Sequence, residues 1–350
     1  MSTDVSVLGY PTFNDIMQNY SSLDARARFV MPARVLDRTT PFIKMLPMVA
    51  SNNILFNVGS RTDSLPQANF RMYDQGIKSV ASKNIPITDP IALAEMYSEV
   101  DKDKWEIQNE PNVWRSDQDM NCMEGMHQLI ESTVIYGNLT TNPGGFNGLS
   151  TRFNNLTSVP NGSSDFKPNV WNGGATSGNC TSAWMIEFDP TGFYGIYPPN
   201  TPAGLSVRDL GEDTAQQTDV LGSVGNMYKH QVLRSLLRWY IGIQVSDERC
   251  VQRIANINPT LLSSNNFDES IFIAAKNQLP RFGEYGTTAI FVNRDLKTQI
   301  DIRATVQKIN AYTNFTANET DVFGKSVTKF QNIPIYVAEK LLSTETPVSA

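Results

Sequence analysis

The sequence predicts an α+β fold. Three observations predict it: one long helical pattern near the middle of the chain, several stretches in which apolar and polar residues alternate, and a final third in which helix and strand patterns follow one another. The chain has 350 residues, of which 40% are hydrophobic and 18% are charged. That is enough for one large or two ordinary domains with a substantial core.

The stretch 109–138 predicts one long helix against which the rest of the fold packs. Pro111 lies near its start, where a missing N–H costs nothing, and Asn109 is the expected cap. Gly137 and Asn138 predict a left-handed stop. About 25 residues at 1.5 Å each give a rod of roughly 37 Å. Its apolar stripe recurs at steps of three and four residues, through Met120, Met123, Met126 or His127, Ile130 and Val134.

Residues 1–41 predict an extended arm. Their apolar residues show no clean period and prolines interrupt them, so we expect only one short helical piece around 12–20. The segment 26–44 carries five basic residues against Asp37 alone, and two interpretations stay open, a solvated arm or a contact with an acidic partner. An arm without its own core must lie on the body of the chain or on a neighbour.

Residues 42–85 predict a β-hairpin with a long tip. Apolar side chains between 54 and 58 show the strand period, the stretch 60–68 is polar, and 69–77 resumes an extended pattern. A single hairpin cannot form its own hydrophobic core, so we expect contacts with other chains to stabilise it. A strand over 91–101 follows, directly before the long helix.

Beyond the helix, the residues of 182–188 and 193–197 predict a hairpin whose turn lies at 189–192. A longer β region, 228–257, is expected to turn at 246–247 and pair back on itself. The final third predicts a helix over 267–279 capped by Asn265 or Asn266, a buried strand over 288–292, a helix from Asn293 to about 308, and one or two strands within 325–337.

No metal or cofactor site is predicted. The two histidines, His127 and His230, are far apart in the sequence and belong to no motif with metal-ligand spacing. The three cysteines, Cys122, Cys180 and Cys250, form no CxxC pair, which suits a reducing compartment and argues against a disulfide framework. His127 and Cys122 lie on the long helix, where packing explains them better than ligation.

No catalytic residues are predicted either. Glu95 and Glu99 imitate a carboxylate pair, but on a strand they simply line a solvated face. The glycine-lysine-serine stretch at 324–326 matches the end of the phosphate-binding loop motif, but the first glycine of that motif is missing, because position 319 is glutamate. The glycines at 222–225 do not form a nucleophile elbow. We therefore expect a protein that is not an enzyme.

The bulk properties exclude further classes. A net charge of −6 does not indicate non-specific electrostatic binding to nucleic acid. The start of the chain shows no signal-peptide pattern and no run of about 18 apolar residues occurs, so we expect a protein made and kept in a cytoplasm, with no membrane partner.

Four short blocks, in a preserved order, resemble a known family. The first is Leu8-Gly9-Tyr10-Pro11-Thr12. The second is Tyr136-Gly137-Asn138 with Asn142-Pro143, Phe146, Gly148-Leu149 and Arg152-Phe153. The third is Trp184 and Ile186 with Gly195-Ile196-Tyr197-Pro198, Ala203-Gly204-Leu205 and Asp209-Leu210-Gly211-Glu212. The fourth is Trp239, Gly242, Val245, Asp247 and Arg249 with Arg253-Ile254-Ala255-Asn256-Ile257. Together they resemble the major capsid proteins of short-tailed bacteriophages, from about residue 8 to 338.

The resemblance implies the tailed-phage capsid (Johnson) fold with a permuted strand order. It implies an N-terminal arm (1–41), an extended loop made by the hairpin (42–85), a peripheral domain (86–257) with a spine helix at about 110–137 and long strands, and an axial domain (258–350) with the C-terminal strands. It implies a structural protein without catalytic, cofactor-binding or metal residues.

The implied function is self-assembly, as hexamers and pentamers, into an icosahedral shell that encloses double-stranded DNA. The implied partners are copies of the chain, a scaffolding protein, a portal, a cement or decoration protein, and DNA packaged without specific binding. The implied location is the virion capsid, assembled in the cytoplasm of a host bacterium.

Some relatives in this family weld their shells by an isopeptide bond between a loop lysine and an asparagine of a neighbour. No lysine lies between Lys44 and Lys78, so the expected loop tip at Arg61, Thr62 and Asp63 offers none. The sequence therefore predicts a non-covalent shell. The alternatives are a nanocompartment (encapsulin-like) shell protein that encloses a cargo enzyme, and a carbohydrate-binding or hydrolytic protein.

Overall fold

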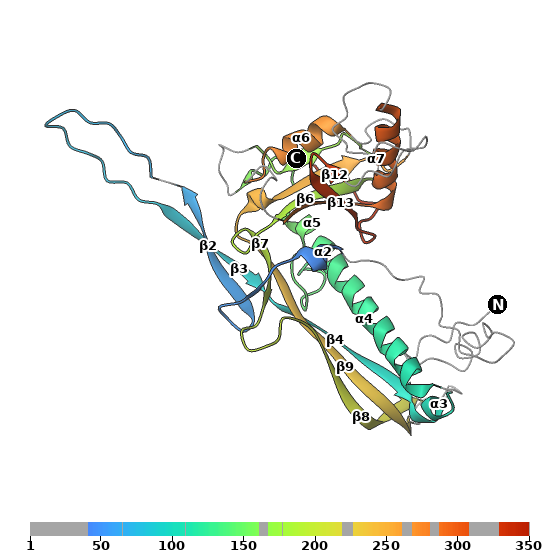
Figure 1. The fold of residues 1–350 in the computed structure, drawn as a ribbon. Coiled ribbons are helices and arrows are strands. Elements are labelled where there is room, and N and C mark those ends of the chain that lie inside the picture. Colours follow the sequence, from blue (N-terminus) through green and yellow to red (C-terminus); the bar gives the residue numbers. More distant parts are fainter. Residues whose placement is uncertain are drawn as a thin grey trace. The chain divides into compact units, whose positions relative to one another are not determined.

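The computed structural model describes residues 41–64, 66–108, 110–160, 167–176, 178–218, 227–260, 268–280, 287–307 and 329–349 (Figure 1). The expected arm, including its helical piece and the basic residues before Pro41, lies outside these ranges. The chain divides into two compact units. Within the described residues, the small unit contains Leu93–His127 and Gly204–Trp239, and the large unit contains the remainder.

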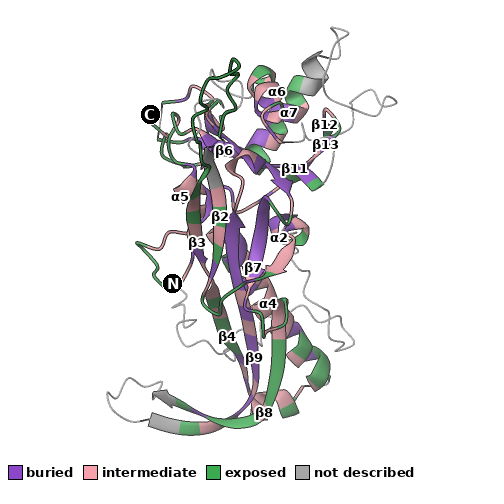
Figure 2. Ribbon diagram, turned by 90° about the vertical axis from the view of Figure 1, so that its left-hand side faces the viewer, coloured by how far each residue is buried: buried purple, intermediate pink, exposed green. Residues whose placement is uncertain are grey.

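A six-stranded sheet forms the centre of the large unit. Its strand order is β12 (Lys329–Phe330), β13 (Ile333–Val337), β11 (Thr287–Val292), β6 (Thr181–Phe188), β10 (Val251–Ile257) and β5 (Val170–Asn172). Every residue of β6 and β10 is buried (Figure 2), because side chains cover both faces of these strands. Helices α6 (Glu269–Lys276) and α7 (Arg294–Gln307) supply part of that cover, with Phe272 and Leu296 in the same apolar cluster as Met185. The predicted α+β class is confirmed.

A second sheet has the order β1 (Met48–Ala50), β7 (Phe193–Tyr197), β9 (Met227–Val245) and β4 (Ala92–Asp101), and β8 (Gly204–Thr218) pairs with β9. In the large unit, β7 lies parallel to β1 and antiparallel to the end of β9. Helix α2 (Pro41–Met45) precedes β1, and its Phe42 ring stacks on Phe291 at 3.8 Å between centroids.

In the small unit, the first part of helix α4 (Pro111–Tyr136) packs on β9. The His127 ring meets the Trp239 ring edge-on at 5.0 Å, and Trp114, Met126, Leu233 and Leu237 are buried. The short helix α3 (Lys102–Glu106) precedes α4 and is capped by Asp101, which accepts a hydrogen bond from the Asp103 N–H at 2.9 Å. On β4, Glu95 pairs with Arg238 and Glu99 pairs with Arg234, both at 2.5 Å. These two carboxylates are therefore engaged in ion pairs and do not form an acid–base pair.

The predicted long helix is confirmed, but its predicted left-handed stop is wrong. Gly137 is not in the positive-φ region. Its N–H donates to the carbonyl oxygen of Thr133 at 2.8 Å, and the Gly148 N–H donates to the Gly137 carbonyl at 2.8 Å. A Cβ at Gly137 would lie 2.3 Å from the carbonyl oxygen of Phe146. Glycine is needed here because the returning chain before α5 (Leu149–Arg152) lies directly against the end of the helix. The expected cap Asn109 lies outside the described residues.

Two predicted hairpins are wrong in their pairing. The turn at 189–192 exists, but β6 and β7 belong to different sheets, and the same is true of β9 and β10 on either side of the 3₁₀ turn η3 (Glu248–Cys250). These two crossings lie side by side, because the Ser246 N–H donates to the Gly192 carbonyl at 2.8 Å. A Cβ at Gly192 would lie 2.5 Å from the Cys250 sulfur. Turn chemistry was therefore identified correctly, whereas the sheet that each strand joins was not.

Of the two predicted N-caps of the C-terminal helices, the structure confirms one and not the other. The Asn293 side chain accepts from the Leu296 N–H at 2.8 Å and caps α7, as expected. Helix α6 is shorter than predicted and is capped by Asp268, which accepts from the Ser270 N–H at 2.9 Å. The predicted caps Asn265 and Asn266 and the glycine-lysine-serine stretch at 324–326 lie outside the described residues.

Candidate functional site

Several of the most exposed apolar residues of the described chain gather on a hairpin that projects from the rest of the large unit in Figure 1. Among the described residues, strands β2 (Phe56–Ser64) and β3 (Lys83–Pro90) pair only with each other, in an antiparallel register from Phe56 opposite Pro90 to Ser64 opposite Lys83. All residues of the connecting loop 66–82 are exposed. Its large apolar side chains are Phe70 at 108% exposure, Tyr73 at 97%, Met72, Ile77 and Val80.

The loop has a definite turn at its end. The Gln75 N–H donates to the Met72 carbonyl at 3.3 Å, and the Arg71 guanidinium donates to the Gln75 carbonyl at 2.9 Å. Asp74 adopts a φ of 66°, in the left-handed region that aspartate tolerates in turns. A two-stranded hairpin is only marginally stable alone, and exposed apolar patches mark interaction sites. These two properties make the hairpin the candidate contact surface of the described chain.

The hairpin was predicted, but its register was wrong. The stretch 69–77, expected as the returning strand, is loop, and β3 begins only at Lys83. The expected tip residue Arg61 lies within β2, opposite Ile85, and Thr62 lies opposite Asn84. Asp63 falls where the register shifts between Thr62 and Ser64. The side chains of 62–64 are not among the described ones.

The observed register places a lysine in the loop at the end of the hairpin. Lys78 lies in the exposed loop 66–82, so the hairpin tip does offer a lysine. The stated reason for expecting no isopeptide bond is therefore wrong. The non-covalent shell itself stays a prediction.

Polar contacts hold the base of the hairpin on the large unit. The Asn57 amide donates to the Gln244 side-chain oxygen. The Asp89 carboxylate pairs with Arg152 at 2.6 Å, and the Arg61 guanidinium pairs with Glu248 at 2.6 Å. Between these contacts lies a cavity of about 210 Å³, lined by Arg61, Ile85, Pro86, Ile87, Arg152, Phe153, Ser158, Asn169, Val245 and Glu248.

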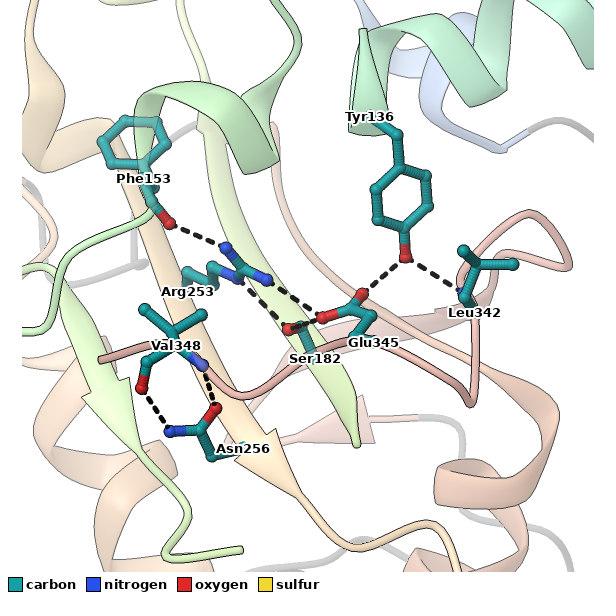
Figure 3. A network of polar contacts seen from close by, with 8 residues as sticks. All are labelled: Tyr136, Phe153, Ser182, Arg253, Asn256, Leu342, Glu345 and Val348. Carbon is teal, nitrogen blue, oxygen red and sulfur yellow. Dashed lines mark hydrogen bonds and ion pairs between the residues drawn. The ribbon is translucent and has the colours of Figure 1, made fainter. Parts of the chain in front are cut away.

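A second polar centre is buried at the C-terminus (Figure 3). The Arg253 guanidinium donates to the Phe153 carbonyl at 2.8 Å, to the Ser182 hydroxyl at 3.1 Å and to the Glu345 carboxylate at 2.9 Å. Glu345 also accepts from the Tyr136 hydroxyl at 2.5 Å. Burial, followed by the nearby Glu345 charge, raises the pKa of Tyr136 above its ordinary value. The network joins the end of α4, the end of α5, strands β6 and β10, and the C-terminal segment.

The C-terminal segment is also held through its backbone. Cys180 and Glu345 exchange both backbone hydrogen bonds, at 3.1 and 2.8 Å. The Asn256 side chain accepts from the Val348 N–H at 2.7 Å and donates to its carbonyl at 2.9 Å (Figure 3). Sequence reasoning missed this centre, because nothing in the sequence pairs Arg253 with a glutamate so far along the chain.

Chemistry-bearing side chains do not converge elsewhere in the described residues. These hold no group of three histidine, cysteine, aspartate or glutamate residues that could bind a metal ion. Cys122, Cys180 and Cys250 form no disulfide bond in the part of the chain that the structure describes. Burial raises the pKa of Cys250 and of Cys122, so both are poor nucleophiles. No helix of the described chain has the length and apolar character needed to span a membrane.

A family model described as major capsid protein GP7 matches residues 25–349. The chain belongs to this family. The match confirms the major capsid protein predicted from the four blocks, and it makes the chain a structural subunit of a shell.

The chain is similar to several solved structures. A chain in the near-atomic-resolution structure of bacteriophage Epsilon15 is similar with a TM-score of 0.70 and 21% identity, over 100% of both chains. The capsid of bacteriophage JBD30 gives a TM-score of 0.45 and 14% identity, over 88% of this chain and 93% of that one. The SrpI encapsulin of Synechococcus elongatus PCC 7942 gives a TM-score of 0.42 and 11% identity, over 73% and 99%. No curated protein matches the chain. The Epsilon15 likeness confirms the predicted capsid fold.

Proposed function

We propose that this major capsid protein assembles, as hexamers and pentamers, into the icosahedral shell that encloses the double-stranded DNA of a tailed phage. One observation carries the proposal. The hairpin β2–β3 exposes Phe70, Tyr73 and Met72 on a loop that no other described residue covers. A second copy of the chain is the partner that a shell subunit always meets.

The contact needed from each hairpin is small. Fully burying one large apolar side chain contributes about 1.5–3 kcal/mol. Two or three loop residues therefore supply a weak contact per subunit after the entropy of ordering the loop is subtracted. Weak contacts suit a closed shell, since many of them act together and each can re-form during growth.

The parts of the chain take the roles that the sequence implied. We assign 1–41 to the arm, 42–85 to the extended loop, 86–257 to the peripheral domain and 258–350 to the axial domain around the capsomer centres. The separate two-stranded sheet of the hairpin supports the second of these assignments. The permuted strand order belongs to the same proposal.

The proposal includes partners and location. A net charge of −6 suits a container that does not hold its DNA tightly. We infer a non-enzymatic chain that works with a scaffolding protein, a portal and a cement or decoration protein. Assembly takes place in the cytoplasm of the host bacterium, and the final location is the virion capsid.

The test is expression of the chain alone, followed by size-exclusion chromatography and negative-stain microscopy. We expect uniform shells or ring-shaped hexamers. The variant F70S/Y73S should give folded subunits that assemble poorly, because it removes apolar area from the loop and leaves the core untouched. The matched control is Val207→Ser, an exposed apolar residue of β8 outside the hairpin. A stable wild-type monomer would refute the proposal.

Native particles separate the phage shell from the nanocompartment alternative. Nuclease-protected double-stranded DNA inside purified particles supports the phage assignment. Particles that contain a cargo protein and no genome would instead support the nanocompartment.

A further inference from the structure

The hairpin meets the rest of the large unit through contacts of unequal strength. Near its base, Asn57 donates to Gln244, and a Cβ at Gly59 would lie 2.4 Å from the Gln244 amide nitrogen. The Ile91 N–H donates to the Leu55 carbonyl at 2.9 Å. The backbone at the base is therefore close-packed and has little room to move.

Further out, the two ion pairs differ in burial. The Asp89 side chain is only 5% exposed, and loss of Arg152 would leave its carboxylate buried without a cation. Arg61 and Glu248 are 19% and 29% exposed. Arg61 and Arg152 are shielded alike, at 19% and 20%, so the two pairs differ in their carboxylates. Water reaches Glu248 more readily than Asp89 and can replace its cation at a lower cost. Asp89–Arg152 is thus a fixed contact, whereas Arg61–Glu248 can open.

The cavity gives the hairpin space to tilt. It lies between β3, through Ile85, Pro86 and Ile87, and the body, through Phe153 and Val245. Close-packed surfaces cannot shift without strain, but a void of about 210 Å³ can widen or close. Arg61 and Glu248 both line this cavity, so their ion pair bridges the space that a tilt would change.

A small tilt has a large effect at the loop. From Arg61 to Tyr73 the chain runs for about 12 residues, which reach at most roughly 40 Å at the strand rise of 3.3 Å per residue, because β2 ends at Ser64. A rotation of about 10° at the base would therefore move Tyr73 by at most roughly 7 Å. That shift decides which surface of a neighbour the loop can meet.

We propose that the Arg61–Glu248 ion pair sets the tilt of the hairpin and can release it, while Asp89–Arg152 serves as its pivot. Arg61 and Glu248 are positioning residues for the contact made by loop 66–82. This inference rests on the proposed function only for its consequence in assembly. The tilt itself is a property of the single chain.

The first experiment measures the tilt in unassembled subunits. Spin labels are placed at Met72→Cys in the loop and Thr298→Cys on α7, in a Cys122→Ser background, and the distance distribution is measured by pulsed electron paramagnetic resonance. Both sites are exposed and lie in the large unit. We expect Arg61→Gln to broaden or shift the distribution by on the order of 7 Å. The charge swap R61E/E248R should restore it.

The control is Arg238→Gln, which breaks an exposed ion pair with Glu95 in the small unit and should leave the distribution unchanged. An R61Q distribution identical to that of the wild type would overturn the inference, as would a swap that fails to restore it.

The second experiment follows assembly. We expect R61Q to give particles of mixed diameter and the swap to recover a single diameter. If the spin labels move but the particle diameters do not, the pair positions the hairpin without governing assembly, and that half of the inference fails. If the wild type forms no particles at all, the proposed function fails while the tilt measurement still decides the role of Arg61.

Discussion

Glu345→Ala tests whether the C-terminal polar centre holds the large unit together. The substitution leaves the Arg253 guanidinium, 3% exposed as a side chain, without its anion. Removing one partner of a buried ion pair costs about 3–5 kcal/mol. The Tyr136 and Ser182 hydroxyls lose an acceptor as well, at about 1 kcal/mol each. Since these losses share one network, we expect a total of about 4–5 kcal/mol rather than their full sum.

The assay is thermal and urea unfolding followed by tryptophan fluorescence. The Trp184 ring lies 5.1 Å from the Arg253 guanidinium carbon and is fully buried, so its emission reports on this centre. A loss of 4–5 kcal/mol lowers the melting temperature by roughly 8–20 °C, at about 2–4 °C per kcal/mol for a unit of 150–250 residues.

Two variants sharpen the test. The double variant R253M/E345L removes both charges, and it should recover most of the stability because no buried ion is left unpaired. Glu95→Ala, which opens a partly exposed ion pair with Arg238, should cost less than about 1 kcal/mol. The reasoning is refuted if E345A unfolds within about 1 kcal/mol of the wild type, since Arg253 would then not depend on Glu345.

Four further predictions follow from the same contacts. Because burial raises the pKa of Tyr136 in the folded state, its contribution to the free energy of unfolding is fully present below the unfolded-state pKa of 10.0 and is lost as the pH rises beyond that value. Urea unfolding should therefore show stability falling above pH 10.0. Tyr136→Phe should remove the share of this fall that is due to Tyr136. Gly137→Ala should cost about 1–3 kcal/mol, because its Cβ would press on the Phe146 carbonyl, whereas Gly76→Ala, in open space, should stay within about 0.5 kcal/mol by the same unfolding assay. Cys180 and Cys250 are buried and should react with a thiol reagent only after denaturation, whereas Cys122 should react slowly in the native chain. Fast labelling of Cys250 in the native chain would contradict the burial that raises its pKa. Assembled particles should run as a single subunit band on denaturing gels, as a non-covalent shell requires. A ladder of linked subunits that Lys78→Arg abolishes would instead show a covalent shell.

Features that depend on neighbouring residues could be predicted from the sequence. Helix α4 was found because apolar residues recur at steps of three and four from Met120 to Val134, and Pro111 marks its first turn. Asn293 was recognised as a cap because its side chain satisfies a donor three residues on. Strands β4 and β11 were found from their period and composition.

Features that depend on distant partners could not. The turn at 189–192 looks like that of any hairpin, and only the tertiary fold sends β6 and β7 to different sheets. The start of β3 at Lys83 is set by cross-strand register, for which the long loop leaves no local signal. Arg253 and Glu345 are ordinary residues in sequence and become a buried pair only when β10 and the C-terminal segment meet.

The adjacency of the two crossings, 189–192 and 246–250, has a mechanical consequence. A single connecting chain between two sheets would let them swivel about its backbone bonds. Here two connections run side by side, joined by the hydrogen bond from Ser246 to Gly192 and packed at Cys250. Paired connections resist torsion, so a twist applied to β7 or to the end of β9 reaches β6 and β10 instead of being lost in a loop. Load on one sheet of the subunit is therefore carried by both.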